Sequence, residues 1–101
     1  MILTAVPHAQ IFNGTGFYLA QNDPNPFNGM TKIKLSLHFE SKITVLITNP
    51  YGKVIDKLVS NKLCAGIYEI QFYANELPRG TYFYHIVADN FFESREMEII
   101  I

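Results

Sequence analysis

Hydrophobic and polar residues alternate along most of this chain, which is the pattern of β-strands with one buried face. The two clearest runs are TKIKLSLHF, from residue 31, and KITVLITN, from residue 42. Their predicted inward positions are Ile33, Leu35 and Leu37 in the first run and Ile43, Val45 and Ile47 in the second. The sequence NPYG at 49–52 then predicts a turn, with Gly52 able to supply a positive φ.

The second half of the chain continues the alternation with more aromatic residues. The segment KVIDKLV, residues 53–59, favours an edge strand, because lysines on an edge discourage pairing with other chains. The segment ANELPRG, residues 74–80, is polar and long enough to cross from one sheet to another. The predicted inward positions here are Tyr68, Ile70 and Phe72, then Tyr82, Tyr84 and Ile86, and finally Phe91, Met97, Ile99 and Ile101.

These strands predict an all-β fold. No helical stripe of useful length occurs, and short strands recur about every 8–12 residues with turn residues between them. The prediction is an immunoglobulin-like antiparallel β-sandwich of about seven strands over residues 17–101. Residues 1–16 are interpreted as a linker remnant or an extra strand. A chain of 101 residues is a single domain.

Composition narrows the function classes. A net charge of −1 argues against nucleic acid as a partner, because binding to phosphates needs a concentrated basic surface. No segment approaches the roughly 18–20 apolar residues of a membrane span. The N-terminus does not read as an intact secretory signal, which leaves an intracellular protein or a piece of a longer exported one. Cys64 is the only cysteine and is expected to be a small, partly buried residue.

The charges are unevenly placed along the chain. Residues 31–62 hold six lysines and two acidic residues, whereas the remainder holds two arginines and seven acidic residues. One interpretation is two solvated sheet faces of opposite sign. The other is a polarity that favours head-to-tail contact or docking of a partner.

Catalytic and metal-binding patterns are missing from the sequence. His8, His38 and His85 fall in no metal-ligand spacing, and the last two are expected to be solvated on strand surfaces. Glu96 and Glu98 share a strand face with nothing that would hold one of them protonated. The chain is therefore predicted to be no enzyme and to use no cofactor and no metal.

The segment QNDPNPFNG, residues 21–29, is the most unusual stretch. Each X-Pro pair disfavours helix and each proline removes a backbone donor, so an extended, kinked loop is expected. Asp23, Asn25 and Asn28 could bind calcium in principle, but the loop lacks the several carboxylates that such a site demands. The favoured interpretation is a rigid lead-in that sets the register of the first long strand.

Four ordered motifs resemble one family. LAQNDPNPFNGMTKIKLSL, VLITNPYGKVIDKLV, CAGIYEIQFYANELPRGTYFYHIV and ESREMEI together resemble a type IX secretion system C-terminal sorting domain, over residues 17–101. The immunoglobulin-like module of the flagellar hook-capping protein is a close cousin. The motif positions that the resemblance carries over are Pro24, Asn25, Pro26, Phe27, Gly52, Gly66, Gly80, Tyr82, Tyr84 and Met97.

The resemblance implies a function. It implies a module at the end of a cargo protein of a Bacteroidota-type cell, secreted or held at the cell surface after passage through the periplasm. The implied partners are the outer-membrane translocon, a sortase-like peptidase and the upstream cargo domain. The proposed recognition strand is Arg95, Glu96, Met97, Glu98 and Ile99, read by strand addition or by side-chain pockets.

Two features depart from the family pattern. Family members usually carry Lys or Arg just before the last-motif methionine and at the C-terminus, whereas this chain has Glu96 before Met97 and ends in EIII. Cys64 stands where a small polar residue or proline is usual. A different class of function also remains open, a self-assembling structural module that exchanges edge strands in a dimer or filament. A third hypothesis is a carbohydrate-binding sandwich using Tyr73 and Phe83.

Overall fold

The computed structural model describes residues 2–6, 17–88 and 91–100, with side chains described from residue 17 onward. Three features of the sequence analysis lie outside the described residues: Ile101, which was predicted to point inward, His8, and most of the segment 1–16. The strands within the described ranges are β1 (Ile2–Val6), β2 (Phe17–Leu19), β3 (Met30–Leu37), β4 (Ser41–Thr48), β5 (Val54–Leu63), β6 (Gly66–Tyr73), β7 (Gly80–Ala88) and β8 (Phe91–Ile99).

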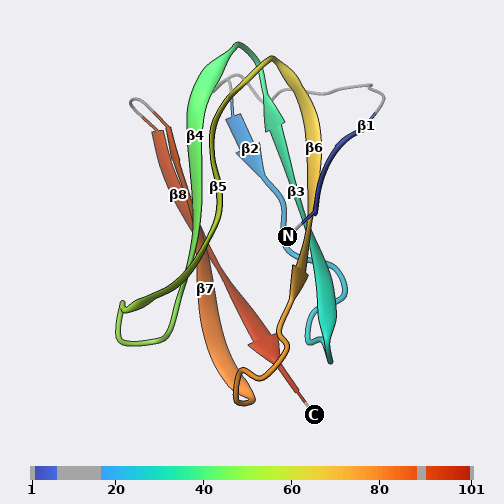
Figure 1. Cartoon of the computed structure of the whole chain (residues 1–101), viewed down its shortest axis with the longest axis vertical. Coiled ribbons are helices and arrows are strands. Elements are labelled where there is room, and N and C mark those ends of the chain that lie inside the picture. Colours follow the sequence, from blue (N-terminus) through green and yellow to red (C-terminus); the bar gives the residue numbers. More distant parts are fainter. Residues whose placement is uncertain (1, 7–16, 89–90, 101) are drawn as a thin grey trace.

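These strands form two four-stranded antiparallel sheets that pack face to face (Figure 1). Sheet A has the strand order β1-β6-β3-β2, and sheet B has the order β5-β4-β7-β8. The described residues include no helix. The order β2-β3-β6 against β5-β4-β7-β8 is that of an immunoglobulin-type sandwich. The predicted all-β, immunoglobulin-like class is confirmed.

The predicted alternation builds the core. The inward residues of β3, β4 and β7 are buried, and the largest of them, Tyr84, has no exposed surface. The remaining fully buried apolar positions of these three strands are Ile33, Leu35, Leu37, Ile43, Val45, Ile47 and Ile86. Each strand thus supplies an apolar face to the space between the sheets, and burial of these faces drives the packing.

The ends of the strands carry local features of the fold. The hydroxyl of Tyr82 donates a 2.8 Å hydrogen bond to the carbonyl of Pro78, four residues earlier, which is the tyrosine-corner arrangement of immunoglobulin-like domains. In the β4–β5 turn, Gly52 has φ +87° and its N–H bonds the Asn49 carbonyl at 3.0 Å. The connection at 74–79 crosses from sheet A to sheet B, as predicted.

The outer strands differ in how their edges are protected. β5 is the edge of sheet B, as its lysines predicted, and it pairs with β4 through two register shifts. Such irregularities discourage further pairing of an edge. β1 pairs with residues 67–71 of β6 and so extends sheet A at its other end.

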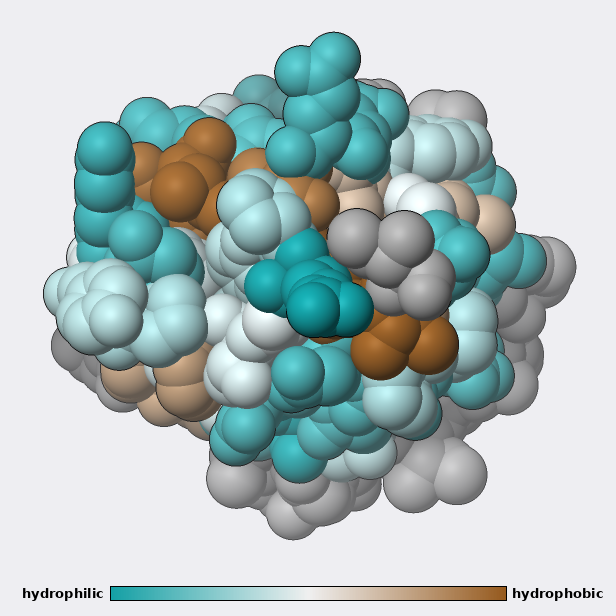
Figure 2. Space-filling view, turned by 90° about the horizontal axis from the view of Figure 1, so that it is seen from below, coloured by the Kyte–Doolittle hydropathy of each residue, from teal (hydrophilic) through white to brown (hydrophobic). Residues whose placement is uncertain are grey.

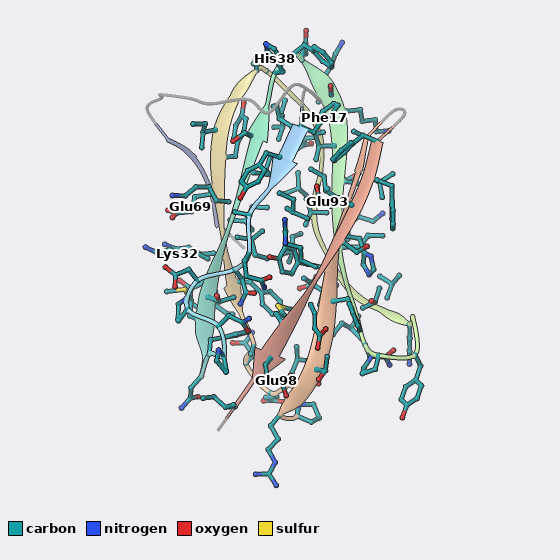
Figure 3. All side chains as sticks on the ribbon, turned by 180° about the vertical axis from the view of Figure 1, so that it is seen from behind. Phe17, Lys32, His38, Glu69, Glu93 and Glu98 are labelled. Atoms are coloured by element: carbon teal, nitrogen blue, oxygen red, sulfur yellow. The ribbon has the colours of Figure 1, made fainter. Side chains whose placement is uncertain are left out.

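Two expectations about the surface are wrong. Cys64 is exposed, because it lies between β5 and β6 where the chain leaves the sheets. The charges do not divide into two faces of opposite sign. Because basic β3 pairs with acidic β6, Lys34 lies directly across from Glu69 and the surface of sheet A is mixed. Figure 3 shows Lys32 and Glu69 on the same side of the sandwich.

Candidate recognition surface at the terminal strand

The proline loop between β2 and β3 runs along the outer edge of β8, which belongs to the opposite sheet. The N–H of Phe27 donates to the carbonyl of Glu98 at 3.0 Å, and the N–H of Ile100 donates to the carbonyl of Phe27 at 2.8 Å. These bonds form a short parallel bridge between Phe27 and Ile99. The loop therefore joins the two sheets through the backbone.

The side chain of Phe27 fixes this bridge to the core. It is 1% exposed, and its ring meets that of Phe72 edge to face with centroids 6.3 Å apart. Met97 and Ile99, the inward residues of the adjoining strand, are also buried. The proline pair, Pro24 and Pro26, comes directly before this buried phenylalanine.

Two polar side chains of the loop extend the contact. The side-chain oxygen of Asn25 accepts a 2.9 Å hydrogen bond from the N–H of Glu98, and Gln21 Nε2 donates to the carbonyl of Glu96 at 2.7 Å. Alternate residues of an antiparallel strand turn their backbone groups toward the same edge. Four such groups between Glu96 and Ile100 are bonded to the loop, so this part of the β8 edge is occupied.

A buried polar cluster holds the loop in shape. Asn22 is 2% exposed and Thr31 is fully buried. Asn22 Nδ2 donates to Thr31 Oγ1 and to the carbonyl of Pro24, each at 3.1 Å, and Thr31 Oγ1 donates to the same carbonyl at 2.7 Å. Because buried polar groups are costly unless bonded, this cluster favours one loop conformation.

The upper part of β8 is tied to the start of the same segment. Tyr84 donates its hydroxyl to the carbonyl of Ala20 at 2.6 Å, and burial raises the pKa of Tyr84 to about 12. Arg95 Nε donates to the carbonyl of Leu19 at 2.7 Å, and its guanidinium lies 3.3 Å from Glu93. Residues 19–27 therefore follow β8 from Arg95 to its end at Ile99.

The loop and the strand enclose a shallow hollow of about 230 Å³. We call it the seam, and its lining residues are Gln21, Asn25, Glu96, Met97 and Glu98. Met97 has no exposed surface and lies beneath, whereas Gln21, Asn25 and Glu96 are exposed. Figure 3 shows Glu98 toward the lower end of the sandwich, far from Phe17 and His38. The seam is a polar, acidic surface over an apolar base.

The structure brings some of the predicted site residues together and leaves others apart. Asn25 and Met97 line the seam, and Phe27 is bonded beside it to Glu98. Gly80 lies across from Ile99 at the end of β8. Tyr82 pairs across the sheet with Met97, and Tyr84 with Arg95. Pro24 and Pro26 are exposed on the loop. Gly52 and Gly66 lie at other turns and take no part in the seam.

His85 is not the solvated surface histidine that was expected. It is half-buried, with Nε2 2.8 Å from Thr48 Oγ1 and Nδ1 2.6 Å from Ser94 Oγ. This burial lowers its pKa. His85 is less exposed than expected because the rings of Phe83, on the same strand, and Phe92, on β8, stack against its imidazole.

Metal binding at the loop gains no support from the geometry. The oxygen of Asn25 is already bonded to the N–H of Glu98. Within residues 2–6, 17–88 and 91–100, no three His, Cys, Asp or Glu side chains are grouped so that they could hold a metal ion.

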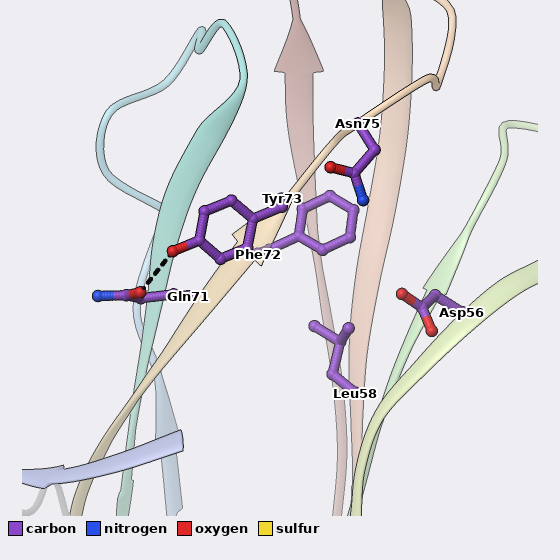
Figure 4. Close-up of a pocket in the computed structure, with 6 residues that line it drawn as sticks. All are labelled: Asp56, Leu58, Gln71, Phe72, Tyr73 and Asn75. Carbon is purple, nitrogen blue, oxygen red and sulfur yellow. Dashed lines mark hydrogen bonds between the residues drawn. The ribbon is translucent and has the colours of Figure 1, made fainter. Parts of the chain in front are cut away.

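A second hollow lies on the other side of the sandwich, between β5 and β6. It measures about 260 Å³ and is lined by Asp56, Leu58, Gln71, Phe72, Tyr73 and Asn75. Figure 4 shows Phe72 pointing toward Leu58 and Asp56, while Tyr73 turns away and bonds Gln71 at 2.9 Å. Seen from below, the end of the molecule is mostly hydrophilic with separate hydrophobic patches (Figure 2). No converging set of reactive groups lines this hollow among the described residues.

Comparison with known families decides the class of the chain. The sequence profile of the family described as "Secretion system C-terminal sorting domain" matches residues 24–101. The chain belongs to this family. The match begins at Pro24 and includes β8 and four of the five residues that line the seam, all but Gln21. No curated protein matches the chain.

Membership of the sorting-domain family shows the general function of the chain. The chain is a C-terminal sorting signal for type IX secretion, which leads through the periplasm to the cell surface or the extracellular space. It interacts with the type IX secretion machinery, and the family is not an enzymatic one. In the described part of the chain, no helix has the length and apolar character needed to cross a membrane.

Some residues that form or support the seam could not be identified from the sequence. Gln21 and Asn22 precede the proline pair and gave no signal of their own, since Gln and Asn are ordinary loop residues. The contact of Arg95 with the carbonyl of Leu19 was likewise unforeseen. Asn25 and Met97 were singled out only by the resemblance to the sorting-domain family, which did not show that the two residues lie next to each other.

Proposed function

We propose that this sorting domain is a non-enzymatic module that the outer-membrane translocon binds in its folded state, at the seam. An upstream cargo domain would then be carried to the cell surface with it. The observation that carries the proposal is the backbone contact of Phe27 with Glu98 and Ile100, which joins the loop and the terminal strand in one surface. Both parts of that surface lie within the residues that match the family.

The hydrogen bonds at the seam favour one mode of recognition over another. Strand addition needs free backbone donors and acceptors along an edge. Between Glu96 and Ile100, the outward groups of β8 are bonded to Gln21, Asn25 and Phe27. Recognition there is therefore proposed to use side chains, without a new strand on β8.

Burial then separates the proposed recognition strand into two sets. Met97 and Ile99 point into the core, where a partner reaches them only if the strand opens. Glu96 is exposed and Glu98 is partly exposed. We propose that the two glutamates are the residues read directly, and that Met97 holds them in place from beneath.

The charge of the seam indicates the chemistry of the partner surface. Glu96 occupies the position where the family usually has Lys or Arg, and no basic residue lines the seam. Complementary potentials guide association and suppress wrong partners. The surface that binds this chain is proposed to present Lys or Arg to Glu96 and Glu98.

The proposal is tested by export of a fused reporter. The reporter would carry a signal peptide, with this chain at its C-terminus, in a bacterium that has the type IX system. The expected result is reporter at the cell surface or in the medium, and periplasmic retention of the same reporter without the chain. Equal distribution of the two reporters would contradict the proposal.

A further inference from the structure

The outer face of sheet B carries a row of stacked rings that runs from β7 to the edge strand β8. Phe83 and His85 stack with ring centroids 6.4 Å apart, and His85 stacks with Phe92 at 5.8 Å. Val87 lies directly across from Phe92, and Leu46 lies across from His85. Phe92 is 64% exposed and Val87 36% exposed. Contiguous exposed apolar surface of this kind marks an interaction site.

Opposite charges flank this row on its two sides. The strand register places Lys57 beside Leu46, on the β5 side of the face. Lys62, further along β5, lies beside Lys42 and is paired with Glu40 at 3.8 Å. The register places Glu96 beside Phe83 at the opposite edge, on β8, with Glu98 two residues further along the same face. The face therefore runs from basic, through apolar, to acidic.

We infer that this face binds a second copy of the same chain. Two copies can meet face to face about a two-fold axis that lies in the interface and exchanges the two edges. Lys57 of each copy then lies near Glu96 of the other, because the register sets the two residues only two positions apart along the strands. The rows of rings meet between these charges. A surface that complements itself in this way gives a closed, isologous dimer and not a filament. The dimer face shares Glu96 and Glu98 with the proposed recognition surface, but the dimer is tested on the purified chain without the secretion machinery.

The dimensions of the face set the strength of the association. Four strands about 4.8 Å apart, with about 3.4 Å per residue, give a face of roughly 20 by 30 Å. That lies at or below the roughly 800 Å² per partner of a standard interface, so a weak dimer with a dissociation constant in the micromolar range or above is expected.

Sedimentation velocity of the purified chain over a concentration series tests the dimer. The expected result is a reversible monomer–dimer equilibrium that weakens as salt is added, because screening reduces the attraction of exposed charges. Phe92→Ser should weaken dimerisation at least about tenfold, since Phe92 is the most exposed ring of the row and aromatic residues carry much of the affinity of an interface. Tyr51→Ser is the matched control, because Tyr51 is 92% exposed on the β4–β5 turn, outside the face.

A charge exchange tests the orientation of the two copies. Lys57→Glu and Glu96→Lys should each weaken the dimer, and the double variant should recover most of the loss because the edges become complementary again. A chain that stays monomeric at all concentrations, one that forms open polymers, or a dimer unaffected by Phe92→Ser would overturn the inference. So would a double variant weaker than both single ones.

Discussion

The backbone N–H of Glu98 donates a 2.9 Å hydrogen bond to the side chain of Asn25, 73 residues earlier in the chain. The bond joins the proline loop, which leads into sheet A, to the edge strand of sheet B. Together with the Phe27 bridge, it makes the last strand of the domain depend on a loop near its start. The seam can therefore exist only in the folded domain.

The first prediction concerns this bond. Asn25→Ala should cost about 1 kcal/mol of unfolding free energy, the usual net worth of one hydrogen bond. It should also speed hydrogen exchange of the Glu98 amide, which loses its acceptor. Asn28→Ala is the matched control, because Asn28 is exposed on the same loop and makes no side-chain hydrogen bond to the described residues. Equal exchange rates for Glu98 in both variants would contradict the assigned bond.

The second prediction concerns the anchor of the loop. Phe27→Ala should lower the unfolding free energy by about 3–5 kcal/mol, because it empties a fully packed site in the core. Phe92→Ala, at a largely exposed position, should cost far less. Chemical denaturation of the two variants provides the comparison. Similar losses in both would show that Phe27 does not anchor the loop to the core.

The third prediction concerns Tyr84, whose hydroxyl is bonded to the carbonyl of Ala20. Tyr84→Phe should cost about 1–3 kcal/mol, because the carbonyl loses its partner. Tyr73→Phe should cost less than about 0.5 kcal/mol, since the bond of Tyr73 to Gln71 is exposed. Thermal unfolding at neutral pH measures both.

Alkaline pH gives Tyr84 a second readout. Its pKa is raised from 10.0 to about 12 in the folded state. Between those values the unfolded chain releases the proton first, so stability should fall as pH rises. The fall should be smaller in Tyr84→Phe than in the parent. An identical pH dependence in the two chains would argue against the buried, bonded hydroxyl.

The fourth prediction concerns His85, whose pKa is lowered by burial. As pH falls below the ordinary value of about 6.5, the unfolded chain takes up the proton before the folded one, so stability should decrease. His85→Gln should reduce this decrease. Urea denaturation between about pH 5 and pH 7 is the measurement. If the loss of stability at low pH were unchanged in His85→Gln, groups other than His85 would be responsible for it.

The core of this domain was predictable because its signal is local. Period-two alternation identified Ile33, Val45 and Tyr84 as inward residues, and the lysines of residues 53–59 identified an edge strand. Turn residues marked where strands end. These features depend on neighbouring residues, which a single sequence displays directly.

The seam was not predictable in the same way. Its bonds join backbone groups of β8 to Gln21, Asn25 and Phe27, and backbone groups look alike in any sequence. The half-burial of His85 likewise depends on rings from two strands, one of them β8. Cys64 was misjudged because its residue type suggested burial, whereas its place at a turn decided its exposure.

The most direct test of the account is export of a reporter fused to chains that differ only at the seam. Glu96→Gln with Glu98→Gln removes both charges and keeps the side-chain shape, and Glu40→Gln with Glu76→Gln is the matched control at two exposed positions elsewhere. Thermal unfolding would confirm that both variants fold. The account predicts that the seam variant remains in the periplasm while the control reaches the surface. Surface display of the seam variant at the level of the control would contradict recognition at the seam.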